Sequence, residues 1–304
     1  MKSIEVAAAA AAVFMLCACG GGGGGGGTII REVAFTSVSA IGPNQRVVMD
    51  GVSLHADAIV AGTTVTSFNI NAPHESNSSM RLTYDGNRNL SGIAFATPEA
   101  SVSFAGNEIN CTTPGACSGT KANGSALGVV IDPVFYGWNY QSFGIWAQDT
   151  SPTGFRAGTI SAGAASPVSA LPLSTGTFMG HASGFFVDRN GVFGVTDADM
   201  TAIANFGAGT INFATTNTTF FGSTTLPNGA PASGLDLTGT LTYGPGNRFS
   251  GTVDAVRPID GSNPQITGTA TGRFYGPNAE EMGGVFGLGS TIGERYLGAF
   301  GGRR

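Results

Sequence analysis

The sequence predicts an all-β protein, in which a β-rich N-terminal handle domain precedes a C-terminal eight-stranded antiparallel β-barrel. Glycine accounts for 49 of the 304 residues, and charged residues make up 11%, against about 25% in ordinary globular chains. Alternating apolar and polar residues recur after Thr175, and sequences typical of tight turns separate the alternating segments. This combination favours many short strands joined by tight turns.

The overall composition also argues against two other classes of protein. Hydrophobic residues make up 41% of the chain and the net charge is only −5, which disfavours a disordered chain. Nucleic acid is not expected as a partner, because a phosphate-binding face needs clustered Lys and Arg. The nearest such group is the terminal pair Arg303-Arg304.

The first residues are typical of an export signal. Lys2 supplies a positive charge, and an apolar run from Val6 to Leu16 follows, which is too short to span a bilayer. The next residues, "LCAC", resemble a bacterial lipobox in which Cys19 is the lipidated residue. We therefore predict a signal peptide over residues 1–18 and an acylated, for example palmitoylated, Cys19. The alternative is an ordinary signal peptide with incidental cysteines.

Eight consecutive glycines, Gly20 to Gly27, follow Cys19. A glycine run behaves as a flexible coil. Directly after a lipidated cysteine it predicts a tether, so residues 19–27 would hold the folded body close to a membrane.

The remaining cysteines, Cys111 and Cys117, stand at the ends of "CTTPGAC". An exported chain is oxidised, and Pro114-Gly115 allows the segment to turn back sharply. We expect a small disulfide-closed loop. A metal site would need further ligands nearby, which the sequence does not place there.

The handle domain is expected over residues 28–166 and the barrel over residues 167–304. The boundary falls in the Ser-, Ala- and Pro-rich segment "SAGAASPVSALPLST". Hairpins in the first half are indicated by "LTYDGNRNLSG", which resembles "LTYGPGNRFSG" in the second half. Both read as strand, tight turn and strand.

The barrel strands are predicted from period-two alternation. In residues 235–243 the leucines occupy one face and threonines the other, and residues 266–275 repeat this pattern with Phe274 inside and Tyr275 outside. Eight antiparallel strands can close into a barrel filled by side chains. The segment "TDADMTAIANF" could instead form a helical turn. The eight predicted strands are Gly176–Val187, Val192–Asn205, Gly209–Phe220, Leu235–Tyr243, Arg248–Val256, Ile266–Tyr275, Glu281–Leu288 and Arg295–Phe300.

Together with the lipobox and the glycine tether, one segment of the barrel, "GRFYGPNAEEMGGVFG", resembles a known family. The chain is similar to the transferrin-binding-protein-B-like surface lipoproteins of Gram-negative bacteria, and "YQSFGIW" and "PLSTGTFMGHASG" resemble the family's passage from handle to barrel. The residues that carry the resemblance are Gly272, Phe274, Tyr275, Gly276, Pro277, Asn278, Ala279, Glu280, Glu281, Gly283, Gly284, Val285 and Phe286.

The resemblance implies a handle followed by a barrel, a lipid anchor as the only membrane attachment, a place on the cell outer membrane facing outward, and no catalysis. It also implies export with the help of a dedicated assembly partner. The full transferrin receptor lipoprotein has two handle-plus-barrel lobes, whereas this chain has one. Single-lobe relatives bind other cargo, including haemoglobin, haem carriers and complement regulators, so transferrin itself is not implied.

Catalysis is not expected from the residues themselves either. Glu280 and Glu281 are adjacent on an extended segment and point to opposite faces, so they cannot converge on one bond. We expect one of them to order the turn at Pro277 and Asn278 through backbone amides. No nucleophile elbow or zinc-protease sequence is present, no cofactor is expected, and the three histidines read as surface or strand residues.

The best functional candidate is the aromatic segment "VFYGWNYQSFGIW". If it is a strand, Tyr136, Trp138 and Tyr140 lie on one side, as in a protein-binding surface or a haem-stacking face. Alternatively, these aromatics pack the handle against the barrel. Phe220-Phe221 is a weaker candidate for a binding tip.

The hypothesis is a surface lipoprotein that binds a host or environmental macromolecule, such as an iron- or haem-carrying protein, without catalysis. The alternative is an adhesive or structural envelope lipoprotein. A membrane-spanning pore is disfavoured, because the outward faces carry Thr, Ser, Asp and Arg where lipid would require an apolar band.

Overall fold

A computed structural model describes residues 30–222, 229–244, 246–256 and 265–304. The predicted signal peptide, the lipidated Cys19 and the tether of residues 19–27 lie outside the described residues. Among the described residues, no helix is long and apolar enough to cross a membrane.

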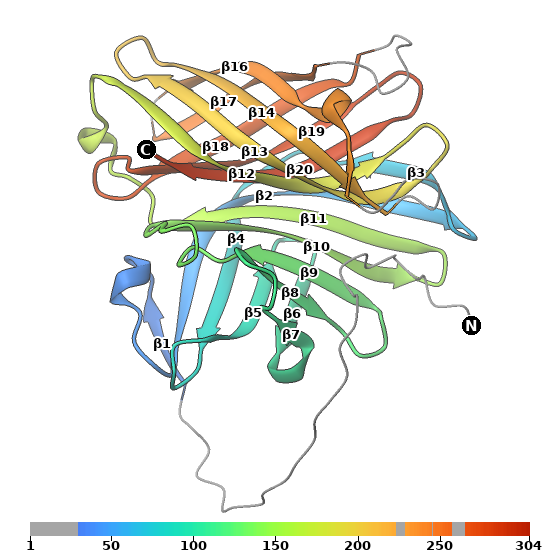
Figure 1. Cartoon of the computed structure of the whole chain (residues 1–304), viewed down its shortest axis with the longest axis horizontal. Coiled ribbons are helices and arrows are strands. Elements are labelled where there is room, and N and C mark those ends of the chain that lie inside the picture. The colour runs from blue at the N-terminus through green and yellow to red at the C-terminus, as the bar shows by residue number, and fades with distance from the viewer. Residues whose placement is uncertain (1–29, 223–228, 245, 257–264) are drawn as a thin grey trace, which may run out of the picture.

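The described strands form two sheets, one from each half of the chain (Figure 1). The first sheet, which we call the handle, precedes Ala164. Its strands are β1 (Arg31–Ala34), β2 (Gln45–Ala61), β3 (Thr64–Ile70), β4 (His74–Tyr84), β5 (Leu90–Ala96), β6 (Ser101–Ala105), β7 (Ile109–Asn110), β8 (Ala116–Thr120), β9 (Ala126–Ile131), β10 (Gln141–Ser151) and β11 (Gly154–Gly163).

The second sheet, which we call the barrel, begins at Thr175. Its strands are β12 (Thr175–Val187), β13 (Phe193–Asn205), β14 (Thr210–Phe221), β15 (Ala230–Pro231), β16 (Leu237–Gly244), β17 (Arg248–Ala255), β18 (Thr267–Tyr275), β19 (Glu281–Gly289) and β20 (Arg295–Arg303). Four short 3-10 helices complete the described elements: η1 (Val38–Ala40), η2 (Gly106–Glu108), η3 (Val168–Ala170) and η4 (Ser233–Leu235).

The all-β fold and the eight-stranded barrel are confirmed. The strand order runs β13-β12-β20-β19-β18-β17-β16-β14, and pairing of β13 with β14 closes the ring. Each predicted strand matches an observed one to within three residues at either end. The segment "TDADMTAIANF" belongs to the strand β13 rather than to a helix, because its alternate residues point into the barrel.

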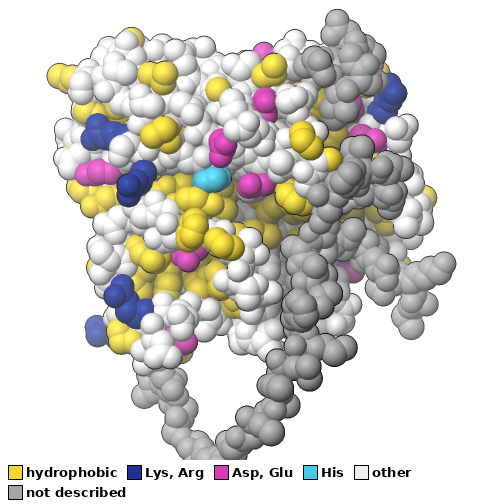
Figure 2. Space-filling view, viewed as in Figure 1, with side chains coloured by type: hydrophobic (Ala, Val, Ile, Leu, Met, Phe, Trp, Pro, Cys, Tyr) yellow, Lys and Arg dark blue, Asp and Glu magenta, His cyan; other side chains and the backbone are white. Residues whose placement is uncertain are grey.

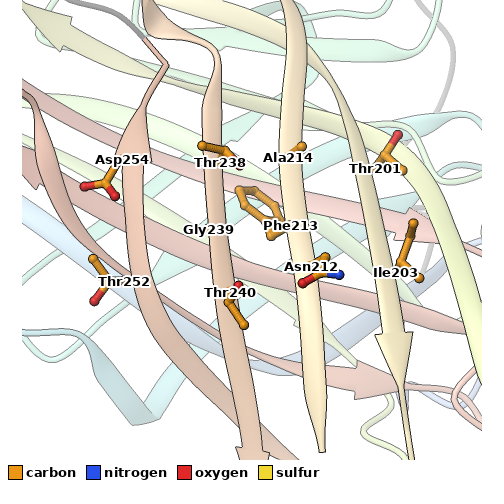
Figure 3. A pocket seen from close by; sticks show the side chains of 10 residues that line it. All are labelled: Thr201, Ile203, Asn212, Phe213, Ala214, Thr238, Gly239, Thr240, Thr252 and Asp254. Atoms are coloured by element: carbon orange, nitrogen blue, oxygen red, sulfur yellow. The ribbon is translucent and has the colours of Figure 1, made fainter. Parts of the chain in front are cut away.

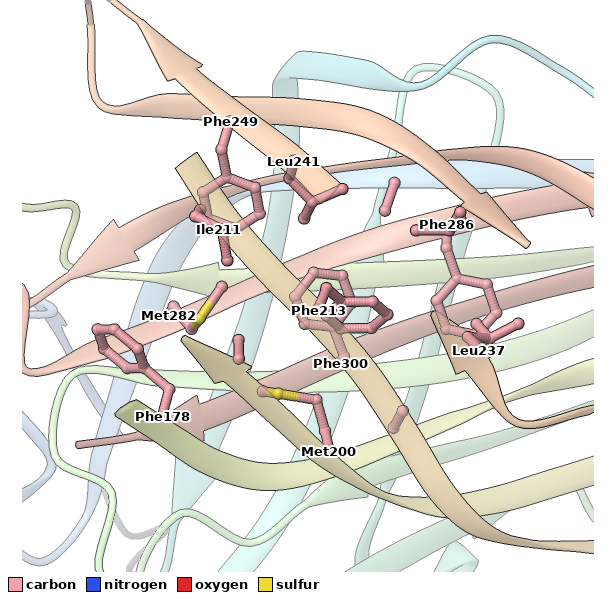
Figure 4. Close-up of a cluster of buried hydrophobic side chains, with 14 of the residues drawn as sticks. Phe178, Met200, Ile211, Phe213, Leu237, Leu241, Phe249, Met282, Phe286 and Phe300 are labelled. Atoms are coloured by element: carbon pink, nitrogen blue, oxygen red, sulfur yellow. The ribbon is translucent and has the colours of Figure 1, made fainter. Parts of the chain in front are cut away.

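The barrel interior is a packed hydrophobic core (Figure 4). Phe274 and Leu237 are fully buried in it, and Phe213 stacks near Phe300 with ring centroids 4.7 Å apart. Burying large apolar side chains is the main favourable contribution to folding. The described part of the interior is therefore filled by side chains.

The handle sheet is strongly curved and open. Its order is β6-β5-β4-β2-β11-β10-β9-β8-β7, with β1 and β3 pairing to the long strand β2. One face encloses a core around Trp146, Phe95 and Phe104. The other face of β2, β10 and β11 packs against the barrel.

The handle and the barrel share a third hydrophobic core where they meet. Leu54 and Phe143 of the handle pack in this core with Phe185 and Leu297, which point outward from the barrel. Tyr275 also points outward, as predicted, but the handle buries it completely, and its hydroxyl lies 3.2 Å from the hydroxyl and carbonyl oxygens of Ser161. The two sheets therefore form one continuous body (Figure 1).

Candidate functional site

The loop between β9 and β10, residues 132–140, lies where the handle meets the barrel; we call it the junction loop. The Asp132 carboxylate accepts the N–H of Val134 at 2.9 Å, and the Pro133 carbonyl accepts the N–H of Trp138 at 2.8 Å. These bonds fold the segment into a compact turn. The predicted strand with Tyr136, Trp138 and Tyr140 on one side is therefore wrong, and the regular strand resumes only at β10.

Contacts with the barrel fix the junction loop in place. The Glu281 carboxylate accepts the backbone N–H groups of Asn139 at 2.5 Å and Tyr140 at 2.9 Å. The Arg303 guanidinium donates to the carbonyl of Gly137 at 2.6 Å. A loop held this way loses little conformational entropy when a partner binds.

The disulfide predicted from the sequence is present and supports the junction loop from the other side. Cys111 and Cys117 are joined with an S–S distance of 2.04 Å. Within the loop they close, the carbonyl of Gly115 accepts the N–H of Asp132 at 3.0 Å. Gly115 has a φ of 82° and lies directly against the Tyr136 ring, so a side chain there would collide with it.

The three candidate aromatics occupy different environments. Trp138 is only 3% exposed and packs in the core between the handle and the barrel. Tyr136 is half-buried, with its ring 5.4 Å from Trp138 and 4.4 Å from His181 of β12. Tyr140 is also half-buried and lies against Gly276. They do not form one exposed face.

Apolar side chains next to these aromatics do reach solvent. Val134 is 59% exposed, Phe135 58% and Met179 of β12 67%. Figure 2 shows apolar side chains gathered beside a histidine at the level where the two halves of the molecule meet. We call Val134, Phe135, Tyr136, Met179 and His181 the junction patch, because both sheets contribute to it.

Acidic side chains border the junction patch. Asp199 of β13 is paired in register with His181, and Asp197 accepts a hydrogen bond from the hydroxyl of Ser183 at 3.0 Å. Partial burial, together with these two aspartates, raises the pKa of the Tyr136 hydroxyl. An apolar centre with charged groups at its rim is the usual arrangement of a protein-binding surface.

The sequence predictions missed a cluster of titratable side chains in the handle. His55, His74 and Glu99 offer ligand atoms that all lie within 4.8 Å of one another. His55 is 5% exposed, and its Nε2 atom lies 4.0 Å from the Asp57 carboxylate. Burial lowers the pKa of His55. No sequence spacing indicates this cluster, because the pairing of β2 with β4 creates it.

A shallow depression lies on the outer wall of the barrel over β13, β14, β16 and β17 (Figure 3). It has a volume of about 590 Å³, and its lining includes four threonines together with Asn212 and Asp254. Its lining residue Thr201 pairs in register with Met179, so the depression adjoins the junction patch. Phe220, the other candidate for a binding tip, is 8% exposed and packs against Phe186 in the barrel core.

Comparison with known proteins identifies the barrel. Residues 175–304 match a family described as the C-lobe and N-lobe beta barrels of Tf-binding protein B. The barrel is therefore similar to this family over its whole length. The matched residues run from the start of β12 to the end of the chain and therefore include every strand of the closed ring.

Solved structures of transferrin-binding protein B and lactoferrin-binding protein B match the chain at low identity. A mutant of the vaccine antigen transferrin-binding protein B from Haemophilus parasuis is 16% identical with a TM-score of 0.49, covering 83% of this chain and 44% of its own. The isotype 1 protein from Neisseria meningitidis is 13% identical with a TM-score of 0.38, covering 86% and 77%. The N-lobe domain of lactoferrin-binding protein B from Moraxella bovis is 12% identical with a TM-score of 0.38, covering 83% and 98%.

The chain thus spans less than half the length of the first of these structures. A search of curated protein sequences found no match.

In the barrel, the two adjacent glutamates have separate structural roles. Glu280 accepts hydrogen bonds from the backbone and side-chain amides of Asn278 at 2.8 and 2.9 Å, which orders the turn. Burial would raise the pKa of Glu280, but these bonds outweigh it and lower the pKa. Glu281 instead reaches the junction loop, and burial raises its pKa to about 7 against the effect of the backbone N–H groups.

Proposed function

We propose that the chain is a lipid-anchored protein of the bacterial outer membrane that binds a host or environmental protein at the cell surface without catalysis. The observation that carries this proposal is the match of the barrel to the transferrin-binding protein B family. The named members bind a protein, and the lipobox at Cys19 followed by a glycine tether would hold such a body at the membrane.

The docking surface that we propose is the junction patch. Phe135 and Val134 supply exposed apolar area, and the Glu281 and Arg303 contacts hold their loop before a partner arrives. Buried aromatic anchors carry much of the affinity in protein interfaces. Tyr136 would contribute at the edge of the surface, whereas Trp138 and Tyr140 would support it from below.

The class of cargo that we propose is an iron- or haem-carrying protein. This rests on the family alone. Free haem can be tested separately, because a bound haem shifts its Soret absorbance when it is mixed with the purified chain. An unchanged Soret band would remove haem itself as the ligand and leave a carrier protein.

Binding can be tested with the purified chain immobilised through its N-terminus on a sensor surface. Transferrin, lactoferrin and haemoglobin would each be flowed over it. Phe135→Ala should weaken binding of the recognised protein at least about tenfold, as expected for a hot-spot aromatic. Ile59→Ala is a matched control, because Ile59 is 55% exposed but lies at the far end of β2.

A result in which the chain binds none of these proteins, and instead associates with itself or with polysaccharide, would favour an adhesive envelope protein. Equal effects of the two substitutions would remove the junction patch as the docking surface while leaving the family function in place.

The anchor and the export route need a test in cells. Cys19→Ala should release the folded protein from the membrane fraction, and protease added to intact cells should cleave the wild-type chain. Protection from protease would place the body in the periplasm, and it would remove the need for a surface-export assembly partner.

A further inference from the structure

Three side chains from separate parts of the handle converge on one point. His55 lies on β2, His74 begins β4, and Glu99 lies in the connection between β5 and β6. The His74 Nε2 atom is 2.9 Å from one Glu99 carboxylate oxygen, and the His55 Nδ1 atom is 3.6 Å from the other. The two imidazole rings stack with centroids 5.6 Å apart.

The buried atoms at the centre of this group have no hydrogen-bond partner among the described residues. His55 is 5% exposed, and neither its Nδ1 atom nor the facing Glu99 Oε2 atom makes a hydrogen bond. A buried polar atom without a partner costs stability. Two such atoms that face each other across 3.6 Å mark a place where a cation would satisfy both.

We propose that His55, His74 and Glu99 bind a divalent transition-metal ion, and that Zn²⁺ fits best. Zinc is commonly held by imidazole nitrogens and carboxylate oxygens at about 2.0–2.1 Å in tetrahedral geometry, which places ligand atoms about 3.3 Å apart. The ligand atoms observed here lie 2.9 to 4.8 Å from one another, so small side-chain rotations suffice.

The surroundings of the three ligands support the same assignment. The side-chain amide nitrogen of Asn71 donates to His55 Nε2 at 2.9 Å and to the Asp57 carboxylate at 3.3 Å, which orients the His55 ring. The ring proton then lies on Nδ1, and a metal ion bound at Nδ1 would displace it. Arg156 donates to the backbone carbonyl of Glu99 at 2.6 Å and pairs with Asp57, so its charge is compensated. Outer-shell contacts of this kind orient metal ligands.

The site connects directly to the barrel through the residue after His74. Glu75 accepts hydrogen bonds from Arg248 through its carboxylate and from Arg273 through its backbone carbonyl. His74 and Glu99 remain partly exposed, so an ion can enter from solvent. A bound ion would join β2, β4 and the Glu99 connection and hold the start of β4 against the barrel.

The test uses the full-length chain with Cys17→Ser and Cys19→Ser, which removes thiols that would bind zinc on their own. After treatment with EDTA, the chain is titrated with Zn²⁺ by calorimetry and with Co²⁺ by visible absorbance. We expect one ion per chain, tetrahedral Co²⁺ bands and a higher Tm with Zn²⁺. His74→Gln and Glu99→Gln should each weaken binding by about 100-fold or more, beyond the 10–100-fold typical of outer-shell losses.

His181→Gln is the matched control, because His181 lies on the barrel outside the cluster. Near-UV circular dichroism of each variant checks that the fold is retained. We expect it to be retained, because the side chains of His74 and Glu99 are both partly exposed. Absence of saturable Zn²⁺ binding would overturn the proposal. So would unchanged binding in His74→Gln and Glu99→Gln, or an equal loss in His181→Gln.

Discussion

The two walls of the barrel differ in how their sequences reflect their surroundings. On the wall away from the handle, β13 alternates strictly between exposed and buried residues from Asp197 to Asn205. On the wall that faces the handle, nearly every residue of β19 and β20 is buried. A strand covered on both faces loses the period-two pattern. Alternation of apolar and polar residues therefore indicates that one face of a strand is exposed to solvent. It is not a property of every strand.

On the wall that faces the handle, glycines rather than alternating residues mark the strands that are covered on both faces. A side chain at Gly283 would meet Ser161 and Gln141 of the handle, and one at Gly287 would meet Leu54. The handle thus packs directly onto the backbone of the barrel. This close approach is what brings the junction loop within reach of Glu281.

The largest expected effect is a difference in unfolding free energy between substitutions of outward-pointing aliphatic residues on the two walls. Leu297 is fully buried between handle and barrel, so Leu297→Ala should lower the free energy of unfolding by about 2–5 kcal/mol. Ile203 is 43% exposed on the other wall, and Ile203→Ala should cost about 1 kcal/mol or less. Urea unfolding measures both, and similar costs would show that the handle does not cover the barrel.

The next effect is a pH dependence that belongs to the covered wall. The pKa of Glu281 is about 7 in the folded chain, above the unfolded value of 4.5, so the folded state holds the proton more tightly. Stability from this group is present below about pH 4.5 and is lost as the pH rises through 7, by at most about 3 kcal/mol.

Urea midpoints at pH 5 and pH 8 measure this dependence. Glu281→Gln should flatten the decline, and Glu280→Gln serves as a control on the exposed turn. If the stability of the wild-type chain changed between pH 5 and pH 8 in the same way as that of Glu281→Gln, the result would contradict a buried Glu281 carboxyl.

A smaller effect is expected from glycine substitutions. Gly283→Ala forces a methyl group to within 2.5 Å of the Ser161 hydroxyl oxygen and should destabilise the chain by about 1–3 kcal/mol. At Gly244 nothing lies within 4 Å of the added Cβ, so Gly244→Ala should change stability by no more than about 0.5 kcal/mol. Equal thermal shifts for the two variants would argue against close packing at Gly283.

The smallest effect concerns one hydroxyl group. Tyr275→Phe removes the hydrogen bonds to Ser161 and should cost about 1 kcal/mol. Tyr136→Phe should have little effect on stability, because its ring lies half-exposed at the surface. Chemical unfolding resolves the difference, and a larger cost for Tyr136→Phe would reverse the assignment of which tyrosine joins the two sheets.

Much of the barrel could be predicted from the sequence, because sequences typical of tight turns separate its alternating segments and its outer wall faces water. The strands of the handle could not be placed individually. β2 is 17 residues long, and although "VSLHAD" alternates between apolar and polar residues, both faces are buried there, so the alternation does not separate a solvent face from a core face. β10 and β11 are likewise covered by the barrel on one face and by the handle core that contains Trp146 on the other.

The candidate site was only partly accessible to sequence reasoning. The aromatic segment was found by composition, but the turn that begins at Asp132-Pro133 buries Trp138 and exposes Phe135 instead. Met179 and His181 join the patch only through the packing of β12 beside the junction loop. Contacts between residues this far apart in the chain leave no local pattern in the sequence.

The junction patch exists only if the handle and barrel form one body, and hydrogen–deuterium exchange of the full chain tests this most directly. The amides of β19, β20, β10 and β11 should exchange together and more slowly than those of β16 and β17, because both faces of the first group are covered. Faster or independent exchange of the handle strands, with β19 and β20 no better protected than β16 and β17, would contradict it.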